Sequence, residues 1–128
     1  MKTIIDKTTK PVLVVGGLGT ALAGLNAFLP RFAVENVQQM EWAPDYTIFV
    51  QHWGIMVCLM GVFMVAAAFV PAWRTPILLY GMLEKAFMVF LVATNLGQDF
   101  AGGFLVPAGM DAFITVWSIL YFATRRAS

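Results

Sequence analysis

The chain has 128 residues, of which 60% are hydrophobic and 12% are charged, and its net charge at neutral pH is +1. An ordinary soluble domain carries about 25% charged residues, so this composition indicates an integral membrane protein of one domain. The small net charge gives no sign of a nucleic-acid partner. The single cysteine, Cys58, excludes an intrachain disulfide bond.

The first predicted membrane span covers residues 11–29 and follows a short basic segment. Its apolar run is long enough to cross the hydrocarbon, and Pro11 suits the first turn of a helix. Small residues recur at every fourth position, at Gly16, Thr20 and Gly24. Such a seam lets a neighbouring helix approach closely within the lipid.

The polar residues 30–45 are predicted to include a short helix on the membrane surface. The second span covers residues 46–70 and carries no charge beyond His52. A second small seam recurs every seven residues, at Gly54, Gly61 and Ala68. This seam predicts another close helix contact, and the two seams together favour a homo-oligomer or a subunit of a membrane complex.

The third span is predicted over residues 77–95 and the fourth over residues 106–124. The short turn at residues 71–76 makes the second and third spans antiparallel neighbours. We therefore expect an all-α, integral membrane bundle of four antiparallel transmembrane helices, forming a single domain over residues 1–128.

Basic residues predict the orientation of the chain in the bilayer. With both termini in the cytoplasm, six of the eight basic residues lie inside, in agreement with the positive-inside rule. These six are Lys2, Lys7, Lys10, Arg74, Arg125 and Arg126. We expect a multi-pass protein of the bacterial cytoplasmic (inner) membrane.

Several polar residues are predicted to converge at the outer mouth of this bundle. They are Tyr46, His52, Asn95, Asp99 and Asp111. An apolar pocket with a few polar groups is the usual form of a site for a small apolar ligand. The alternative interpretation is solvation at the membrane surface, where helix ends carry polar residues.

His52 is the only histidine, and the residues Met56, Met60 and Met64 follow it at steps of four on nearly one helix face. Three interpretations are open. The histidine can lie at the interface above core methionines, it can ligate haem, or the thioethers can form a path for a soft ion such as Cu(I). The metal interpretation lacks a second histidine or a cysteine pair.

Glu84 is predicted to lie about 10 Å deep within the third span. A carboxyl group there should face the interior of the bundle, carry a proton or find a partner. Lys85 follows it, and its long stem is expected to extend toward the cytoplasmic surface. Glu84 is then either a proton-carrying group or a structural hydrogen-bonding acid.

The run His52-Trp53-Gly54 and the turn AAFVPAWRTPILL resemble those of the small four-helix bacterial membrane proteins grouped as DoxX-like. The chain also resembles the styrene oxide isomerase family, whose second helix opens with His-x-Gly and whose fourth helix begins near Gly-Asp. The corresponding residues here are His52 to Gly54 and Gly109 to Asp111.

The isomerase resemblance implies that His52 is the axial ligand of haem b, whose ferric iron acts as a Lewis acid on an epoxide. It also implies a shared position at Asn95. Cys58 stands where that family has an asparagine, and Glu84 lies only near the position of a family aspartate.

We therefore expect a small membrane accessory or scaffold subunit, or a subunit that binds a small apolar ligand. Two alternatives remain. The first is a membrane-embedded, haem-dependent epoxide isomerase that uses His52, and the second is a small proton-coupled transporter that uses Glu84.

Overall fold

The chain folds entirely into helices over the residues that the computed structural model describes, 1–126. The α-helices are α1 (Lys2–Ala21), α2 (Gly24–Phe28), α3 (Pro30–Asn36), α4 (Thr47–Phe69), α5 (Arg74–Thr94) and α6 (Leu105–Arg126). The short 3-10 helices are η1 (Pro44–Tyr46), η2 (Pro71–Trp73) and η3 (Asp99–Phe104).

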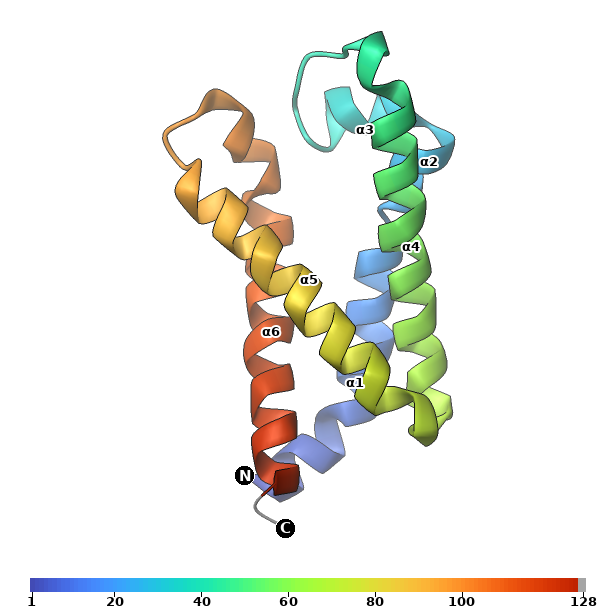
Figure 1. The fold of residues 1–128 in the computed structure, drawn as a ribbon, viewed down its shortest axis with the longest axis vertical. Coiled ribbons are helices and arrows are strands. Elements are labelled where there is room, and N and C mark those ends of the chain that lie inside the picture. Colours follow the sequence, from blue (N-terminus) through green and yellow to red (C-terminus); the bar gives the residue numbers. More distant parts are fainter. Residues whose placement is uncertain (127–128) are drawn as a thin grey trace.

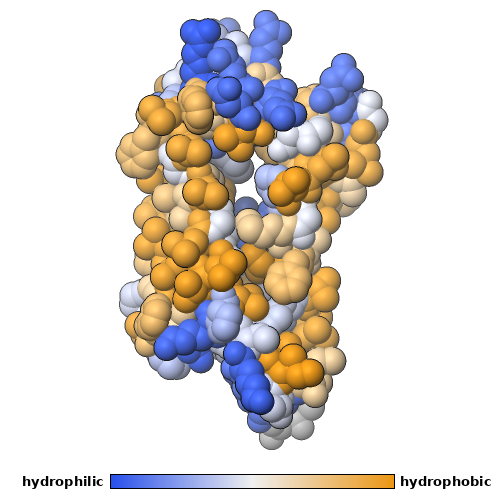
Figure 2. Space-filling model, turned by 180° about the vertical axis from the view of Figure 1, so that it is seen from behind, coloured by the Kyte–Doolittle hydropathy of each residue, from blue (hydrophilic) through white to orange (hydrophobic). Residues whose placement is uncertain are grey.

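Four helical segments within residues 1–126 are long and apolar enough to cross a membrane. They are Lys2–Phe28, Pro44–Phe69, Pro71–Thr94 and Asp99–Arg126. Figure 2 shows apolar side chains around the middle of the molecule and polar ones at its two ends, as a bilayer requires. The prediction of an all-α protein with four membrane-spanning helices is confirmed.

The first helix begins at Lys2, ahead of the predicted start of the span at residue 11, and Pro11 lies inside α1. A proline inside a helix removes one backbone hydrogen bond. Tertiary packing offsets this loss, because Ile5 and Thr9 of the basic segment are buried against the bundle. The same span is interrupted after Ala21 and resumes as α2.

Helices α1 and α2 pack closely against α4 at Gly54 and Gly61 of the second predicted seam. The backbone contact on α1 is made by Gly17 and Ala21, not by the first predicted seam of Gly16, Thr20 and Gly24. A Cβ atom added at Gly17 would lie 2.7 Å from the carbonyl oxygen of Gly61. One added at Gly54 would lie 2.6 Å from the backbone nitrogen of Ala27. The backbones therefore touch directly, as small residues allow within lipid.

Helices α5 and α6 form a second pair, which the turn η2 joins to α4. In that turn Arg74 donates from Nε to the carbonyl of Ala67 at 2.9 Å and from Nη2 to that of Ala68 at 2.8 Å. These bonds satisfy carbonyls that the end of α4 leaves without helical partners.

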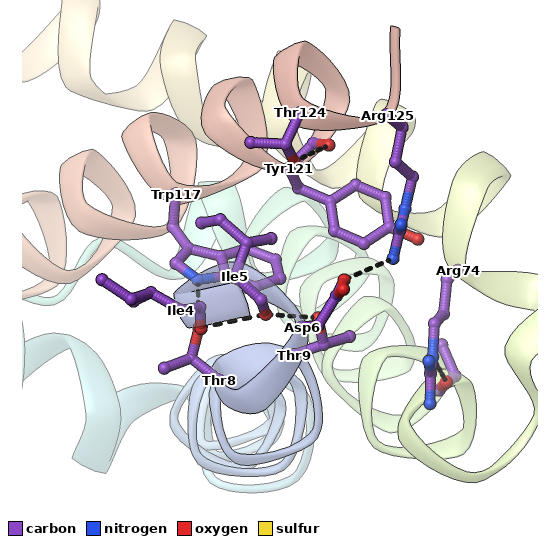
Figure 3. A network of polar contacts seen from close by, with 11 residues as sticks. Ile4, Ile5, Asp6, Thr8, Thr9, Arg74, Trp117, Tyr121, Thr124 and Arg125 are labelled. Carbon is purple, nitrogen blue, oxygen red and sulfur yellow. Dashed lines mark hydrogen bonds and ion pairs between the residues drawn. The ribbon is translucent and has the colours of Figure 1, made fainter. Parts of the chain in front are cut away.

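The two helix pairs are held together at the end of the molecule where both termini lie (Figure 1). Figure 3 shows Trp117 donating from Nε1 to the hydroxyl of Thr8 at 3.0 Å and Asp6 paired with Arg125 at 3.5 Å. The guanidinium of Arg125 also lies 4.0 Å from the centre of the Tyr121 ring. Toward the opposite end, the two pairs spread apart (Figure 1).

Candidate functional site

Lys85 lies in the middle of α5 and is one of the most completely buried side chains, with 1% of its surface exposed. Its ammonium group donates to the hydroxyl of Thr20 in α1 at 2.9 Å and to Oδ1 of Asp111 in α6 at 3.0 Å. The prediction that Lys85 extends to the cytoplasmic surface is wrong. Polar partners on two neighbouring helices hold the ammonium group inside, where an unpaired charge would be costly.

Each partner of Lys85 is itself placed by its helix. The hydroxyl of Thr20 donates to the carbonyl of Gly16 at 2.7 Å, which leaves an oxygen lone pair free to accept from Lys85. Asp111 belongs to the second turn of α6 and is buried.

Glu84 completes a group that we call the charged cluster, consisting of Glu84, Lys85 and Asp111. Oε2 of Glu84 lies 3.9 Å from Nζ of Lys85 and is buried, and it has no hydrogen-bond partner among residues 1–126. The Glu84 side chain as a whole is 28% exposed. The cluster therefore combines one ammonium group with two carboxyl groups, of which that of Glu84 is incompletely paired.

A cavity of about 320 Å³ adjoins the charged cluster, and we call it the cluster cavity. Its walls come from α1, α2, α4, α5 and α6, and they include apolar side chains such as Leu25, Val57, Met88 and Met110. Figure 2 shows the surface hollowed between the two halves of the molecule. The cavity walls also include Leu22, which is exposed on the apolar surface.

A second cavity of about 370 Å³, the loop cavity, lies under the segment that joins α3 to α4. Tyr46 lines this cavity, as does Glu41. The two cavities share five lining residues: Asn26, Gln38, Trp53, Met88 and Phe104.

A pair of amide side chains stands on the wall common to both cavities. Nδ2 of Asn26 donates to Oε1 of Gln38 at 2.9 Å, and Nε2 of Gln38 donates to Oδ1 of Asn26 at 3.3 Å. The backbone of Gln38 touches Gly103 of η3 so closely that a Cβ atom there would overlap it. Residue 39 then adopts a left-handed conformation, with φ of 56° at Gln39. The loop thus connects both halves of the bundle at its wide end.

The five polar residues predicted to converge are not brought together. Asp111 belongs to the charged cluster, and Tyr46 lines the loop cavity. His52, Asn95 and Asp99 line neither of these two cavities. Nδ2 of Asn95 instead donates to the carbonyl of Leu91 at 2.7 Å within α5.

His52 is exposed on α4, while Met60 and Met64 are buried and Met56 is half exposed. Each step of four residues rotates about 40° around a helix, so the predicted common face is lost over three steps. A haem held by His52 would lie outside both cavities, so the surrounding residues do not fit an enclosed haem site. Within residues 1–126, no group of three or more His, Cys, Asp or Glu side chains could hold a metal ion.

Lys85, Thr20, Asn26 and Gln38 were not predicted as site residues. A signal for one pair was present, because Lys85 and Asp111 are opposite charges within adjacent spans. Thr20 and the two amides carry no such signal, since polar residues of this kind occur in many helices as structural hydrogen-bonding groups.

Fold and site together define a small multi-pass membrane protein with a charged cluster beside an apolar cavity. Comparison with known proteins finds no family model, no curated protein and no solved structure that matches the chain. The resemblances to the DoxX-like proteins and to the styrene oxide isomerase family remain predictions.

Proposed function

We propose that this membrane protein binds a small, largely apolar ligand in the cluster cavity. The observation that carries the proposal is a cavity of about 320 Å³ with mainly apolar walls and the charged cluster on one side. Binding sites for small molecules have this form, in which apolar walls supply affinity and a few polar groups fix orientation.

The proposed orientation follows from the distribution of charge. Lys2, Lys7, Lys10 and Arg74 belong to the segments at or next to the end that holds the termini. By the positive-inside rule, this end faces the cytoplasm and the spans are antiparallel in a bacterial inner membrane. Alkaline phosphatase fused at the C-terminus should then be inactive, while a fluorescent protein at the same place should fold and fluoresce. An active phosphatase would show that the C-terminus lies on the opposite side of the membrane and would contradict the proposed orientation.

Ligand binding is tested by titration of the parent protein and of a variant in which a larger side chain fills part of the cavity. The protein is placed in nanodiscs and titrated calorimetrically with the neutral probe 4-phenylbutanol, with empty nanodiscs as the blank. Val57 lines the cluster cavity, so Val57→Phe should weaken binding about tenfold, which corresponds to about 1.4 kcal/mol. Val62 is exposed on the same helix, so Val62→Phe is the matched control and should bind as the parent does.

Equal heats from protein-loaded and empty nanodiscs would contradict the proposal. So would equal weakening by Val57→Phe and Val62→Phe, because partition into the lipid rather than the cavity would then explain the signal.

A second candidate function is transport coupled to protons, and one observation favours it. Glu84 lines the cavity, and its buried Oε2 has no hydrogen-bond partner among residues 1–126. An acid within a membrane span is often a proton-carrying group. Glu84→Gln should then abolish uptake of the cavity ligand into proteoliposomes that carry a pH gradient. Unchanged uptake in that variant would contradict the transport proposal.

A further inference from the structure

We propose that the ligand of the cluster cavity is an apolar cation, whose positively charged group lies against the carboxyl group of Glu84. This inference rests on the proposed ligand binding and names the chemical class of the ligand. Three observations support it: the pairing of Lys85 with Thr20 and Asp111, the excess of carboxyl groups in the cluster, and the aromatic and thioether side chains of the wall.

The ammonium group of Lys85 is already engaged. Two of its three N–H groups are used by Thr20 and Asp111, and Glu84 lies 3.9 Å away. A carboxylate or phosphate ligand would therefore find at most one N–H group of Lys85 still open to it. It would also meet two carboxyl groups, whose charge repels it.

The cluster has one carboxyl group more than its ammonium can neutralise. A carboxylate that lacks a counter-charge within an apolar span is costly, and it needs a proton or a cation. Oε2 of Glu84 is buried without a hydrogen-bond partner among residues 1–126, while the Glu84 side chain as a whole is 28% exposed and lines the cavity. A monovalent cation beside it would bring the cluster to neutrality.

The rest of the wall suits an organic cation better than a metal ion. Trp53 and Phe104 supply aromatic rings, and Met88 and Met110 supply polarizable thioethers. Aromatic faces attract substituted ammonium groups, and methionine adapts to irregular apolar shapes. The walls supply few oxygen ligands beyond the cluster, so they do not replace the hydration shell of a bare metal ion.

A proton competes for the same carboxyl group. The walls that α1 and α4 supply to the cavity contain no titratable side chain; they consist of Gly19 and Thr20 from α1 and Trp53 and Val57 from α4. Lys85 and Asp111 are the other ionisable residues on the wall, within the part of the chain described. The cation should therefore bind more tightly as the pH rises and the cluster loses its proton.

The test uses three probes that share a phenylalkyl chain and differ in their head group, in nanodiscs of zwitterionic lipid. They are (4-phenylbutyl)trimethylammonium, 4-phenylbutanol and 4-phenylbutyrate, titrated calorimetrically at pH 8. We expect the cation to bind about tenfold tighter than the alcohol, as one added charge interaction allows, and the carboxylate to bind weakest. Glu84→Gln should weaken binding of the cation about tenfold more than it weakens binding of the alcohol. Glu35→Gln, at a surface ion pair with Arg31, is the matched control and should change neither.

The outcomes separate the two proposals. If the alcohol binds in a Val57-dependent manner but the cation binds no tighter, the cation assignment is overturned and the proposed function stands. If no probe binds, both fall. If Glu84→Gln does not fold, the parent protein decides at pH 8. Equal affinities for the cation and the alcohol there would overturn the assignment.

Discussion

The ammonium group of Lys85 lies 3.0 Å from Oδ1 of Asp111, and both side chains are buried within membrane spans. The pair joins α5 to α6, and the hydroxyl of Thr20 extends the connection to α1. Three of the four spans therefore meet at one buried polar point. It lies at the edge of the cluster cavity, so one group of residues serves both the packing of the bundle and the proposed binding site.

Replacing Lys85 should destabilise the protein strongly. Lys85→Met leaves Asp111 buried without its partner, and removing one member of a buried ion pair costs about 3–5 kcal/mol. The loss is measured by chemical denaturation in mild detergent. The double variant Lys85→Met with Asp111→Leu should recover part of it, since the carboxyl group that Lys85 bonds is then removed as well. A single variant as stable as the parent would show that the pair contributes little.

Gly61 should tolerate no larger side chain. A Cβ atom at this position would overlap the backbone of Gly17 and Ala21, so Gly61→Val should separate α1 from α4. Overpacking of this kind costs about 3 kcal/mol or more when the backbone must move. Gly109→Val is the matched control, because a Cβ atom there meets nothing within 4 Å. Equal melting temperatures for the two variants would contradict the direct backbone contact.

The paired amides should stabilise the wide end of the bundle. Gln38→Leu leaves the buried amide of Asn26 without its side-chain partner, which costs about 1–3 kcal/mol. Adding Asn26→Leu removes both polar groups and should restore much of the loss. Gln98→Leu, at an exposed position, serves as the control in the same denaturation experiment. Additive losses in the double variant would argue against direct pairing.

Replacing Gln39 by glycine should affect stability differently from the same replacement at an ordinary loop residue. Its φ of 56° is unfavourable for a side chain with a Cβ atom, and glycine removes that strain of about 1 kcal/mol. Gln98 has φ of −95°, so Gln98→Gly gains no such relief and only increases the freedom of the unfolded chain. Gln39→Gly should therefore be the more stable variant by about 1 kcal/mol, and the reverse order would contradict the left-handed conformation.

His52 should have no part in ligand binding by the cluster cavity. It is exposed on α4 and does not line that cavity, so His52→Ala should bind 4-phenylbutanol as the parent does. The visible spectrum of the purified protein, recorded before and after dithionite, tests the haem interpretation separately. A Soret band that disappears in His52→Ala would establish haem ligation at the surface of the bundle.

The sequence by itself determined the four spans and their close contacts. An apolar stretch long enough to cross a bilayer is a property of contiguous residues, so hydropathy locates it without any knowledge of its neighbours. The predicted second span, 46–70, agrees with α4 (Thr47–Phe69) to within one residue at each end. The close helix contact at Gly54 and Gly61 could also be predicted from the sequence, because close approach depends on the small size of those residues themselves.

Only the tertiary structure decided which polar groups meet. The rotation of each helix about its axis places Lys85 inside the bundle and His52 on its surface. The local sequence does not determine that rotation. Packing also extended α1 through the basic segment and past Pro11, and it moved Asp111 from an expected helix end into a buried ion pair. These outcomes depend on partners far away in the chain, such as Thr20 for Lys85, whose contact exists only once the helices have assembled.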